Sequence, residues 1–178
     1  FNLEEEPAEA VEKTPEGWVT LSENAYSLHF IWIANSAEST VSKLDTITGL
    51  ELARYKVCAD PSRTAVDKNG DCWVGCRSGG TVVKITNFVE NCVDKNGDGI
   101  IQTSVDLNNS GAIEADEMLA SMDADECINL VTTPDPAENV IRSVGVDQNN
   151  YPWIGLWNTE QIKQLDPNTG AVVKSYSI

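Results

Sequence analysis

Short runs in which apolar and polar residues alternate recur along most of the chain, and turns rich in Asp, Asn and Gly separate them. Alternation with a period of two is typical of a β-strand that buries one face, and these turn residues tolerate the left-handed backbone of tight turns. Strand signals therefore dominate. The strands expected from this pattern cover residues 18–21, 28–34, 40–45, 50–57, 62–66, 72–77, 81–86, 128–132, 141–146, 153–157, 161–166 and 171–178.

Three of these strands share a sequence unit that contains a tryptophan. Trp32 opens Trp-Ile-Ala, Trp73 opens Trp-Val-Gly and Trp153 opens Trp-Ile-Gly. Twelve residues after each tryptophan comes the apolar centre of a second strand, at Leu44, Ile85 and Leu165. The first two tryptophans are 41 residues apart and the second two are 80 apart, an excess that matches the length of residues 89–127. A period near forty residues made of short strands indicates β-propeller blades, the second carrying an insertion.

The predicted fold is all-β, with about three four-stranded propeller-like blades and one inserted loop segment. Residues 1–17 form an extended acidic lead-in, residues 18–88 form blades one and two, residues 89–127 form the insertion, and residues 128–178 complete blade two and form blade three. Three blades do not close a ring, since propellers contain four to eight. We therefore expect an incomplete propeller, closed by further blades of the same polypeptide or by self-association, with a β-prism as an alternative three-sheet fold.

The blade unit at residues 61–75 contains Pro, a short apolar strand, Asp-Lys-Asn-Gly, a polar residue and Cys-Trp-Val-Gly, and residues 140–155 repeat it. This unit resembles the blades of the streptogramin (virginiamycin B) lyase-like and NHL-type propellers. The resemblance implies the propeller fold and is a poor guide to function. For the lyase members it also implies histidine and metal chemistry. Because the only histidine of this chain is His29, in a strand run, we expect no catalysis.

Inside the insertion, residues 106–117 match the twelve-residue EF-hand calcium loop. That loop needs oxygen ligands at positions 1, 3 and 5, a backbone carbonyl at 7, a ligand at 9, a bidentate carboxylate at 12, and Gly at 6 for the sharp turn. Gly111 stands at position 6. The predicted calcium ligands of this loop are Asp106, Asn108, Ser110, Ala112, Glu114 and Glu117.

A second loop start lies directly before it. Its predicted ligands are Asp94, Asn96, Asp98, Ile100 and Gln102. The twelfth residue is Val105, which has no carboxylate, so a residue outside the loop must close the site. The candidate ligand set includes Glu126 for this role, with Asp106, Asp123 and Asp125 as alternatives. The adjoining loops resemble the EF-hand-like segments of extracellular proteins, as in dockerin and thrombospondin type-3 repeats. This resemblance implies Ca²⁺ as the cofactor, in a structural role.

Charge narrows the range of partners. The chain has 12 Lys plus Arg against 28 Asp plus Glu, a formal net charge of −16. Such a surface repels nucleic acid and anionic membranes, so we expect neither as a partner. No apolar run approaches the length needed for membrane insertion. Divalent cations are the natural counterions for the acidic residues.

The five cysteines indicate an oxidising compartment. Cys92 and Cys127 stand at the two ends of the insertion, where a disulfide would join its ends. Cys58 is expected to pair with Cys72 or Cys76, since the last two are too far apart along one strand to bond each other. A zinc site is the rival interpretation, but the Cys-x3-Cys spacing lacks a second pair. We therefore expect a secreted protein or one at the cell surface.

These observations favour a secreted or cell-surface, calcium-stabilised propeller module with a structural, adhesion or assembly role and no catalysis. The alternative is a lyase-like propeller enzyme or a glycan-binding module whose site lies in blade loops or in absent blades. Expected partners are further copies or blades of the chain itself, and a carbohydrate or another surface ligand. Trp157 is the residue that we would test for carbohydrate stacking.

Overall fold

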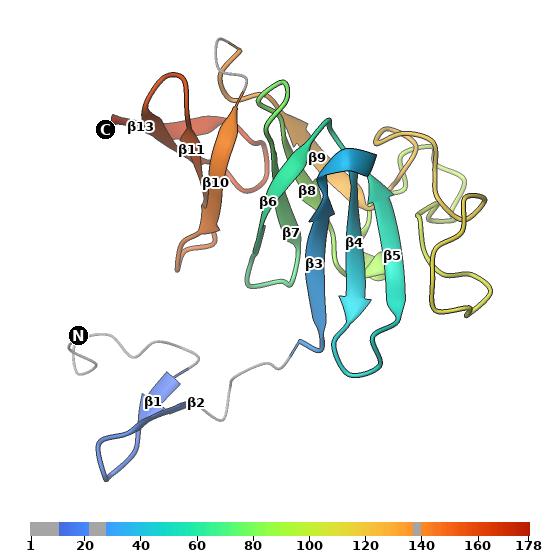
Figure 1. Cartoon of the computed structure of the whole chain (residues 1–178), viewed down its shortest axis with the longest axis horizontal. Helices are drawn as coiled ribbons and strands as arrows, with labels where there is room; N and C mark the ends of the chain where they lie inside the picture. Colours follow the sequence, from blue (N-terminus) through green and yellow to red (C-terminus); the bar gives the residue numbers. More distant parts are fainter. Residues whose placement is uncertain (1–10, 22–27, 137–139) are drawn as a thin grey trace.

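The structure is a computed structural model that describes residues 11–21, 28–136 and 140–178. Three antiparallel sheets stand side by side, and a separate two-stranded hairpin precedes them (Figure 1). Blade one contains β3 (Phe30–Asn35), β4 (Thr40–Asp45) and β5 (Glu51–Lys56). Blade two contains β6 (Pro61–Val66), β7 (Cys72–Cys76), β8 (Val82–Ile85) and β9 (Ile128–Thr132). Blade three contains β10 (Ile141–Val146), β11 (Pro152–Leu156), β12 (Gln161–Leu165) and β13 (Val172–Ser177).

The all-β prediction and the propeller-like blades are confirmed. Strands that follow one another in the chain are neighbours in each sheet, so every blade is an antiparallel meander. The residues that recur in the sequence occupy equivalent positions, because Trp32, Trp73 and Trp153 each lie on the strand that pairs with the strand twelve residues later. No helix among the described residues is long and apolar enough to span a membrane.

The N-terminal part of blade one differs from the prediction. The sequence predicts a strand of blade one at residues 18–21, but β2 (Val19–Leu21) pairs with β1 (Val11–Lys13) instead. A tight local turn explains this choice: Thr14 donates its backbone N–H to the Trp18 carbonyl (2.8 Å), and Gly17 adopts a positive φ of 88°. Blade one therefore has three strands in the part of the chain that the structure describes. The predicted extended lead-in is partly strand, and its first ten residues lie outside the described residues.

An aspartate at the first turn of a blade fixes the tryptophan six residues later. In blade two, Asp67 Oδ1 accepts hydrogen bonds from the backbone of its own turn, and Oδ2 accepts one from the Trp73 indole (3.2 Å). In blade three, Asp147 bonds its turn in the same way and accepts from the Trp153 indole (2.8 Å). One carboxylate therefore holds both the backbone of the turn and the indole ring of the tryptophan in place. The repeated Asp and Trp are therefore one structural device.

Each sheet has two faces, which we call the tryptophan face and the receiving face. The tryptophan face of blade one packs on the receiving face of blade two, and the tryptophan face of blade two packs on blade three. The first contact joins Trp32, Val41 and Tyr55 to Cys72, Val74, Val83 and Ile85. The second joins Trp73, Val82 and Leu130 to Ile141, Ile154, Leu156 and Leu165. Burial of these apolar surfaces is the main contribution to the stability of the array.

A disulfide links the first two blades. Cys58 follows β5 in blade one and bonds Cys76 at the end of β7 in blade two. Of the two partners that the sequence left open, the structure selects Cys76, because the Cα atoms lie 6.1 Å apart. Cys72 is a fully buried free thiol, and burial raises its pKa well above the usual value. It acts as a small apolar residue in the core.

The glycine that follows the tryptophan of blade two allows the close approach of blade three. A Cβ atom on Gly75 would lie 2.6 Å from Val144 and 2.7 Å from Ile141, both on β10. Distances below 3.0 Å require the neighbours to shift, and Gly75 is buried. A small residue at this position of the repeat is therefore a packing requirement.

We predict that Gly75→Ala destabilises the protein by about 1–3 kcal/mol, the usual cost of overpacking a core. Gly145→Ala is the matched control, because a Cβ atom there meets nothing within 4 Å in a strand of the same interface. Urea unfolding of both variants measures the difference. Equal stability of the two variants would contradict the proposed packing role.

A second prediction concerns acid. Burial would raise the pKa of Asp147, but hydrogen bonds from Trp153, Tyr151, Asn149 and Gln164 bring it below its usual value. A carboxylate whose pKa is lower in the folded state stabilises the fold above the unfolded pKa of about 3.9, and this contribution is lost as the pH falls through the folded pKa.

Asp147→Asn should therefore lower the free energy of unfolding by about 1–2 kcal/mol at pH 7, and the gap from the parent should shrink below pH 4. Chemical unfolding at several pH values measures this. Asp116→Asn, at an exposed residue, is the control. A gap that stays constant down to pH 3 would show that ionised Asp147 does not contribute.

Candidate metal centre

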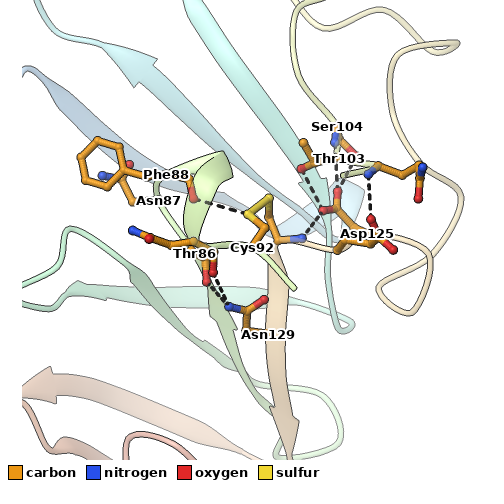
Figure 2. The surroundings of a disulfide bond; sticks show 12 residues. Thr86, Asn87, Phe88, Cys92, Thr103, Ser104, Asp125 and Asn129 are labelled. Atoms are coloured by element: carbon orange, nitrogen blue, oxygen red, sulfur yellow. Dashed lines mark hydrogen bonds between the residues drawn. A yellow bond between two sulfur atoms is a disulfide. The ribbon is translucent and has the colours of Figure 1, made fainter. Parts of the chain in front are cut away.

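The insertion leaves blade two after β8 and returns at β9. Its root is formed by the short 3-10 helix η2 (Val89–Asn91) and by the disulfide between Cys92 and Cys127 (Figure 2). The sequence predicted this disulfide, and the structure confirms it. The bond joins two cysteines that are 35 residues apart in the sequence. In the entropy model, the restriction of the unfolded chain stabilises the folded state by roughly 3–4 kcal/mol.

The middle of the insertion lies along the outer edge of blade one. Val105 forms a β-bridge with Ala53 of β5, and Arg54 donates its backbone N–H to the Ser104 carbonyl (3.2 Å). Glu51 also donates its backbone N–H to the Gly111 carbonyl (2.9 Å). An unpaired strand edge is a site for unwanted association. The insertion therefore covers the edge of β5 although it originates in blade two.

Residues 106–117 close on their last residue through backbone hydrogen bonds. Glu117 Oε1 accepts from the N–H groups of the second and third loop residues (2.9 and 3.2 Å), and Oε2 accepts from that of the ninth (3.1 Å). At the other end, Asp106 accepts from the fifth and sixth loop residues (3.0 and 2.8 Å). Asn108 also accepts from the fifth (2.8 Å). The loop is thus organised around its first, third and twelfth residues.

Residues 94–102 have the same pattern, with Glu126 in the place of a twelfth residue. Glu126 Oε1 accepts from the second and third residues of the loop (2.8 and 3.2 Å), and Oε2 accepts from the ninth (2.9 Å). Asp94 accepts from the fourth and sixth residues (2.6 and 2.9 Å), and Asn96 accepts from the fifth (2.8 Å). Of the four acids considered for closing this loop, the structure therefore brings Glu126 to it.

Glu126 reaches the first loop because the root of the insertion brings it there. The disulfide joins Cys92, which precedes the 94–102 loop, to Cys127, which follows Glu126. In addition, Val93 donates its backbone N–H to the Glu126 carbonyl (3.1 Å). The two loops are consequently interleaved along the chain: the 106–117 loop lies between residues 94–102 and their closing carboxylate. The spacing of residues within the 94–102 loop does not predict Glu126 as the closing carboxylate, because Val105 occupies position 12, where an EF-hand loop has its glutamate.

Asp125, next to Glu126, has a different task. Its carboxylate is almost fully buried and accepts from the Thr103 hydroxyl (2.9 Å), from Ser104 N–H (3.1 Å) and hydroxyl (2.8 Å), and from Cys127 N–H (3.1 Å) (Figure 2). These bonds fix the connection between the two loops. Asp125 is therefore an anchor of the insertion, and sequence reasoning had not separated it from the possible ligands.

The donor set of each loop fits a calcium ion. Calcium takes carboxylate, amide, hydroxyl and carbonyl oxygens, and both loops supply them at the required positions. In the structure these groups bond with one another: the Asn96 amide donates to Gln102 Oε1 (2.7 Å), and the Asn108 amide donates to Glu114 (3.1 Å). Among the described residues no group of three or more His, Cys, Asp or Glu side chains is arranged to hold an ion. Rotating each amide would turn its oxygen toward the other ligands.

The backbone also favours charged carboxylates in both loops. The N–H of Glu114 and further N–H groups lower the pKa of Glu117. The N–H of Ile100, followed by the Gln102 amide, lowers the pKa of Asp98. Ionised carboxylates are the form that binds a cation. The remaining predicted ligands, Ile100 and Ala112, would contribute backbone carbonyls only.

Sequence reasoning missed an open cleft of about 620 Å³ beside the root of the insertion. It is lined by apolar, amide and charged side chains: Leu28, Lys68, Asn69, Asp71, Lys84, Thr86, Phe88, Asn91 and Asn129. Phe88 is 42% exposed, and the Asn129 amide donates to the Thr86 hydroxyl (2.5 Å). The residues come from turns, the 3-10 helix η2 and two strands, spread from position 28 to position 129, so no local motif predicts the cleft. Trp157, which we had selected for carbohydrate stacking, lies outside this lining and carries the Arg142 guanidinium 5.5 Å above its ring.

Comparisons with known proteins support the fold. No family model matches the chain, and no curated protein matches its sequence significantly. Among solved structures, Kuenenia stuttgartiensis hydrazine synthase matches 94% of this chain and 35% of its own, with a TM-score of 0.55 and 10% identity. A streptogramin B lyase matches 94% of this chain and 47% of its own, with a TM-score of 0.53 and 15% identity.

Virginiamycin B lyase from Staphylococcus aureus matches 95% of this chain and 40% of its own, with a TM-score of 0.52 and 12% identity. The chain thus spans less than half the length of each of these structures. Identities this low show the fold alone. The fold and the sheets together define a β-propeller class of protein, with three blades among the described residues.

The anchor role of Asp125 leads to a prediction. Asp125→Ala should destabilise the insertion by about 3 kcal/mol, because it leaves several buried donors without an acceptor. Hydrogen exchange at the Ser104 and Cys127 amides should become faster than in the parent. Asp123→Ala, at an exposed neighbouring acid, is the control. Unchanged exchange at both amides in Asp125→Ala would exclude the anchor role.

Proposed function

We propose that this chain is a calcium-stabilised β-propeller module of a secreted or cell-surface protein, with a structural, adhesion or assembly role and no catalysis. The observation that carries the proposal is the equivalence of the two loops. Both use the same backbone positions to hold a carboxylate at their closing end, although one closing residue is in sequence and the other is remote. Acidic turns that served only the backbone would not need a closing carboxylate at the matched place in both loops.

Charge density supplies the physical reason for a cation. The 39 residues of the insertion contain ten of the 28 acidic residues of the chain, and Lys95 is their only base. Carboxylates this close repel one another unless a counterion lies between them. Calcium stabilises the folded protein if the folded loops bind it more tightly than the unfolded chain does, and a larger difference in affinity gives a larger stabilisation.

The position of the insertion gives the proposed calcium a structural consequence. Glu126 belongs to the return segment, and Asp94 belongs to the outgoing one, so an ion between them joins both ends. The 106–117 loop contacts Glu51 of β5, which donates to the Gly111 carbonyl and accepts from Ile113 N–H (3.2 Å). Calcium in the two loops would therefore tie blade two to the edge of blade one.

Two disulfides support the proposed location outside the reducing cytoplasm.

The alternative function is ligand binding by blade loops, as in a glycan-binding or lyase-like propeller. The cleft favours it, because amide side chains and an exposed aromatic ring are suited to a neutral polar ligand such as a sugar. The two sites are separate, so a module of this kind could use one for stability and the other for recognition.

We predict that the chelated protein binds two calcium ions and gains thermal stability from them. At a calcium concentration 100 times the Kd, the gain is about 2.7 kcal/mol per equivalent site, or about 5–10 °C in Tm for one site. Isothermal titration calorimetry measures the number of sites, and differential scanning calorimetry measures the shift. A Tm that is unchanged at millimolar calcium would contradict the proposal.

Isosteric variants assign the sites. Glu117→Gln should remove the 106–117 site and Glu126→Gln the 94–102 site, so that each leaves about one bound ion. Asp123→Asn is the control, because it removes one negative charge from an exposed residue of the same insertion, and this variant should still bind two calcium ions. If Glu126→Gln still binds two ions with the parent affinity, another residue closes the first loop.

A further inference from the structure

Two arginines without carboxylate partners lie where blades two and three meet. Of the four arginines of the chain, Arg54 and Arg77 form ion pairs with acidic side chains. Among the residues that the structure describes, Arg63 of β6 and Arg142 of β10 form none, although the chain contains 28 acidic residues. Arg63 Nε donates instead to the Arg142 carbonyl (3.1 Å). Two exposed cations are thus held at one junction of a strongly acidic chain.

A β-bulge directs one of these arginines toward an exposed indole. The pairing of β10 with β11 shifts its register between Ile141 and Ser143, so Arg142 is the extra residue. A bulge redirects the side chain that it carries, and the Arg142 guanidinium lies 5.5 Å from the centre of the Trp157 ring. Trp157 is still 67% exposed, so most of its surface is open to water. The Arg142 guanidinium makes no hydrogen bond within the described part of the chain, and its N–H groups are free to bond a ligand.

The equivalent corner of blade two is closed by an ion pair. Arg77 follows its blade tryptophan by four residues, as Trp157 does in blade three. Both donate a backbone N–H to the residue before the first strand of the blade, Arg77 to Asp60 (3.0 Å) and Trp157 to Val140 (3.1 Å). In blade two the Asp60 carboxylate also accepts two hydrogen bonds from the Arg77 guanidinium (2.7 and 2.9 Å). Blade three has an apolar residue and an indole in these places, so its arginine has no acid beside it.

We propose that Arg63, Arg142 and Trp157 bind a carboxylate-bearing sugar, such as a glucuronate unit of an acidic polysaccharide. A guanidinium group binds a carboxylate through two parallel N–H···O bonds. An exposed indole supplies an apolar surface on which the C–H face of a sugar ring can stack. The site lies apart from the cleft, because none of the three residues belongs to the cleft lining. It gives a ligand class to the alternative function and does not depend on the proposed calcium sites.

Charge selects among the anionic ligands that two arginines could bind. A net charge of −16 repels ligands of high charge density, such as nucleic acid or a heavily sulfated polysaccharide. A polysaccharide with one carboxylate on every second ring supplies counterions to the arginines with much less repulsion from the rest of the surface. An acidic peptide would also supply carboxylates, but its aspartate and glutamate side chains present no ring to Trp157. The combination of cations and an exposed indole therefore favours the acidic sugar.

Titration with a tetrasaccharide in which glucuronate alternates with N-acetylglucosamine tests the site, in saturating calcium. NMR spectra of backbone amides, arginine Nε–H and the Trp157 indole follow binding, and we expect a Kd on the order of 1 mM. The same tetrasaccharide with its carboxylates reduced to alcohols should bind about 10-fold more weakly or worse. Arg142→Gln and Trp157→Ala should each weaken binding of the acidic form by about 10-fold. Lys174→Gln removes one positive charge from an exposed residue of β13 and should bind like the parent.

Several results would overturn the proposal. They are equal binding of the acidic and the reduced tetrasaccharide, parental affinity in Arg142→Gln, and no spectral change at about 10 mM tetrasaccharide. A tetraglutamate peptide that binds as tightly as the acidic tetrasaccharide would also overturn it, because charge alone would then explain binding.

A calcium-site variant separates this proposal from the proposed function. Glu117→Gln should bind the tetrasaccharide like the parent, and weaker binding would place the sugar on a calcium ion and contradict the arginine site. If the parent binds no calcium but binds the acidic tetrasaccharide through Arg142 and Trp157, the proposed calcium role is wrong and the sugar site is supported.

Discussion

The blades of this chain bury their large apolar side chains mainly against one another. That constraint organises the whole chain, because each tryptophan face needs a receiving face. The packing of Trp32 and Tyr55 on blade two, and of Trp73 on blade three, provides the two apolar cores. Gly75 permits the close approach of β10, and the Asp–Trp hydrogen bonds hold the rings in position.

The insertion adds a second kind of constraint, which is electrostatic. It exits from blade two, crosses to the edge of β5 and returns through a disulfide, so its geometry is fixed at three places. Its carboxylates are held by backbone N–H groups in two equivalent loops. Ile101, Val105 and Met122 of the insertion pack against the core of blades one and two, but its ten acids and one base leave carboxylates that repel one another. We therefore regard the interleaved loops, each closed by a glutamate and bound to calcium, as the central feature of the proposed function.

Much of the fold could be predicted, because its signals are local. Trp32, Trp73 and Trp153 recur with the strand residues that pair beside them, and Cys92 and Cys127 stand at the ends of the insertion. The pairing of residues 18–21 could not be predicted, since strand propensity does not identify the partner edge. The choice of Glu126 over Asp125 also required the structure. Glu126 accepts hydrogen bonds from the 94–102 loop, whereas the adjacent Asp125 accepts one from Thr103. These partners lie more than twenty residues away in the sequence.

A crystal structure of the calcium-loaded chain, with anomalous data that identify calcium, tests the central claim most directly. The account predicts two anomalous peaks in the insertion, one bounded by Asp106 and Glu117 and one by Asp94 and Glu126. The second peak should contact the Glu126 carboxylate. Absence of both peaks at saturating calcium, or a first loop closed by another acid, would contradict it.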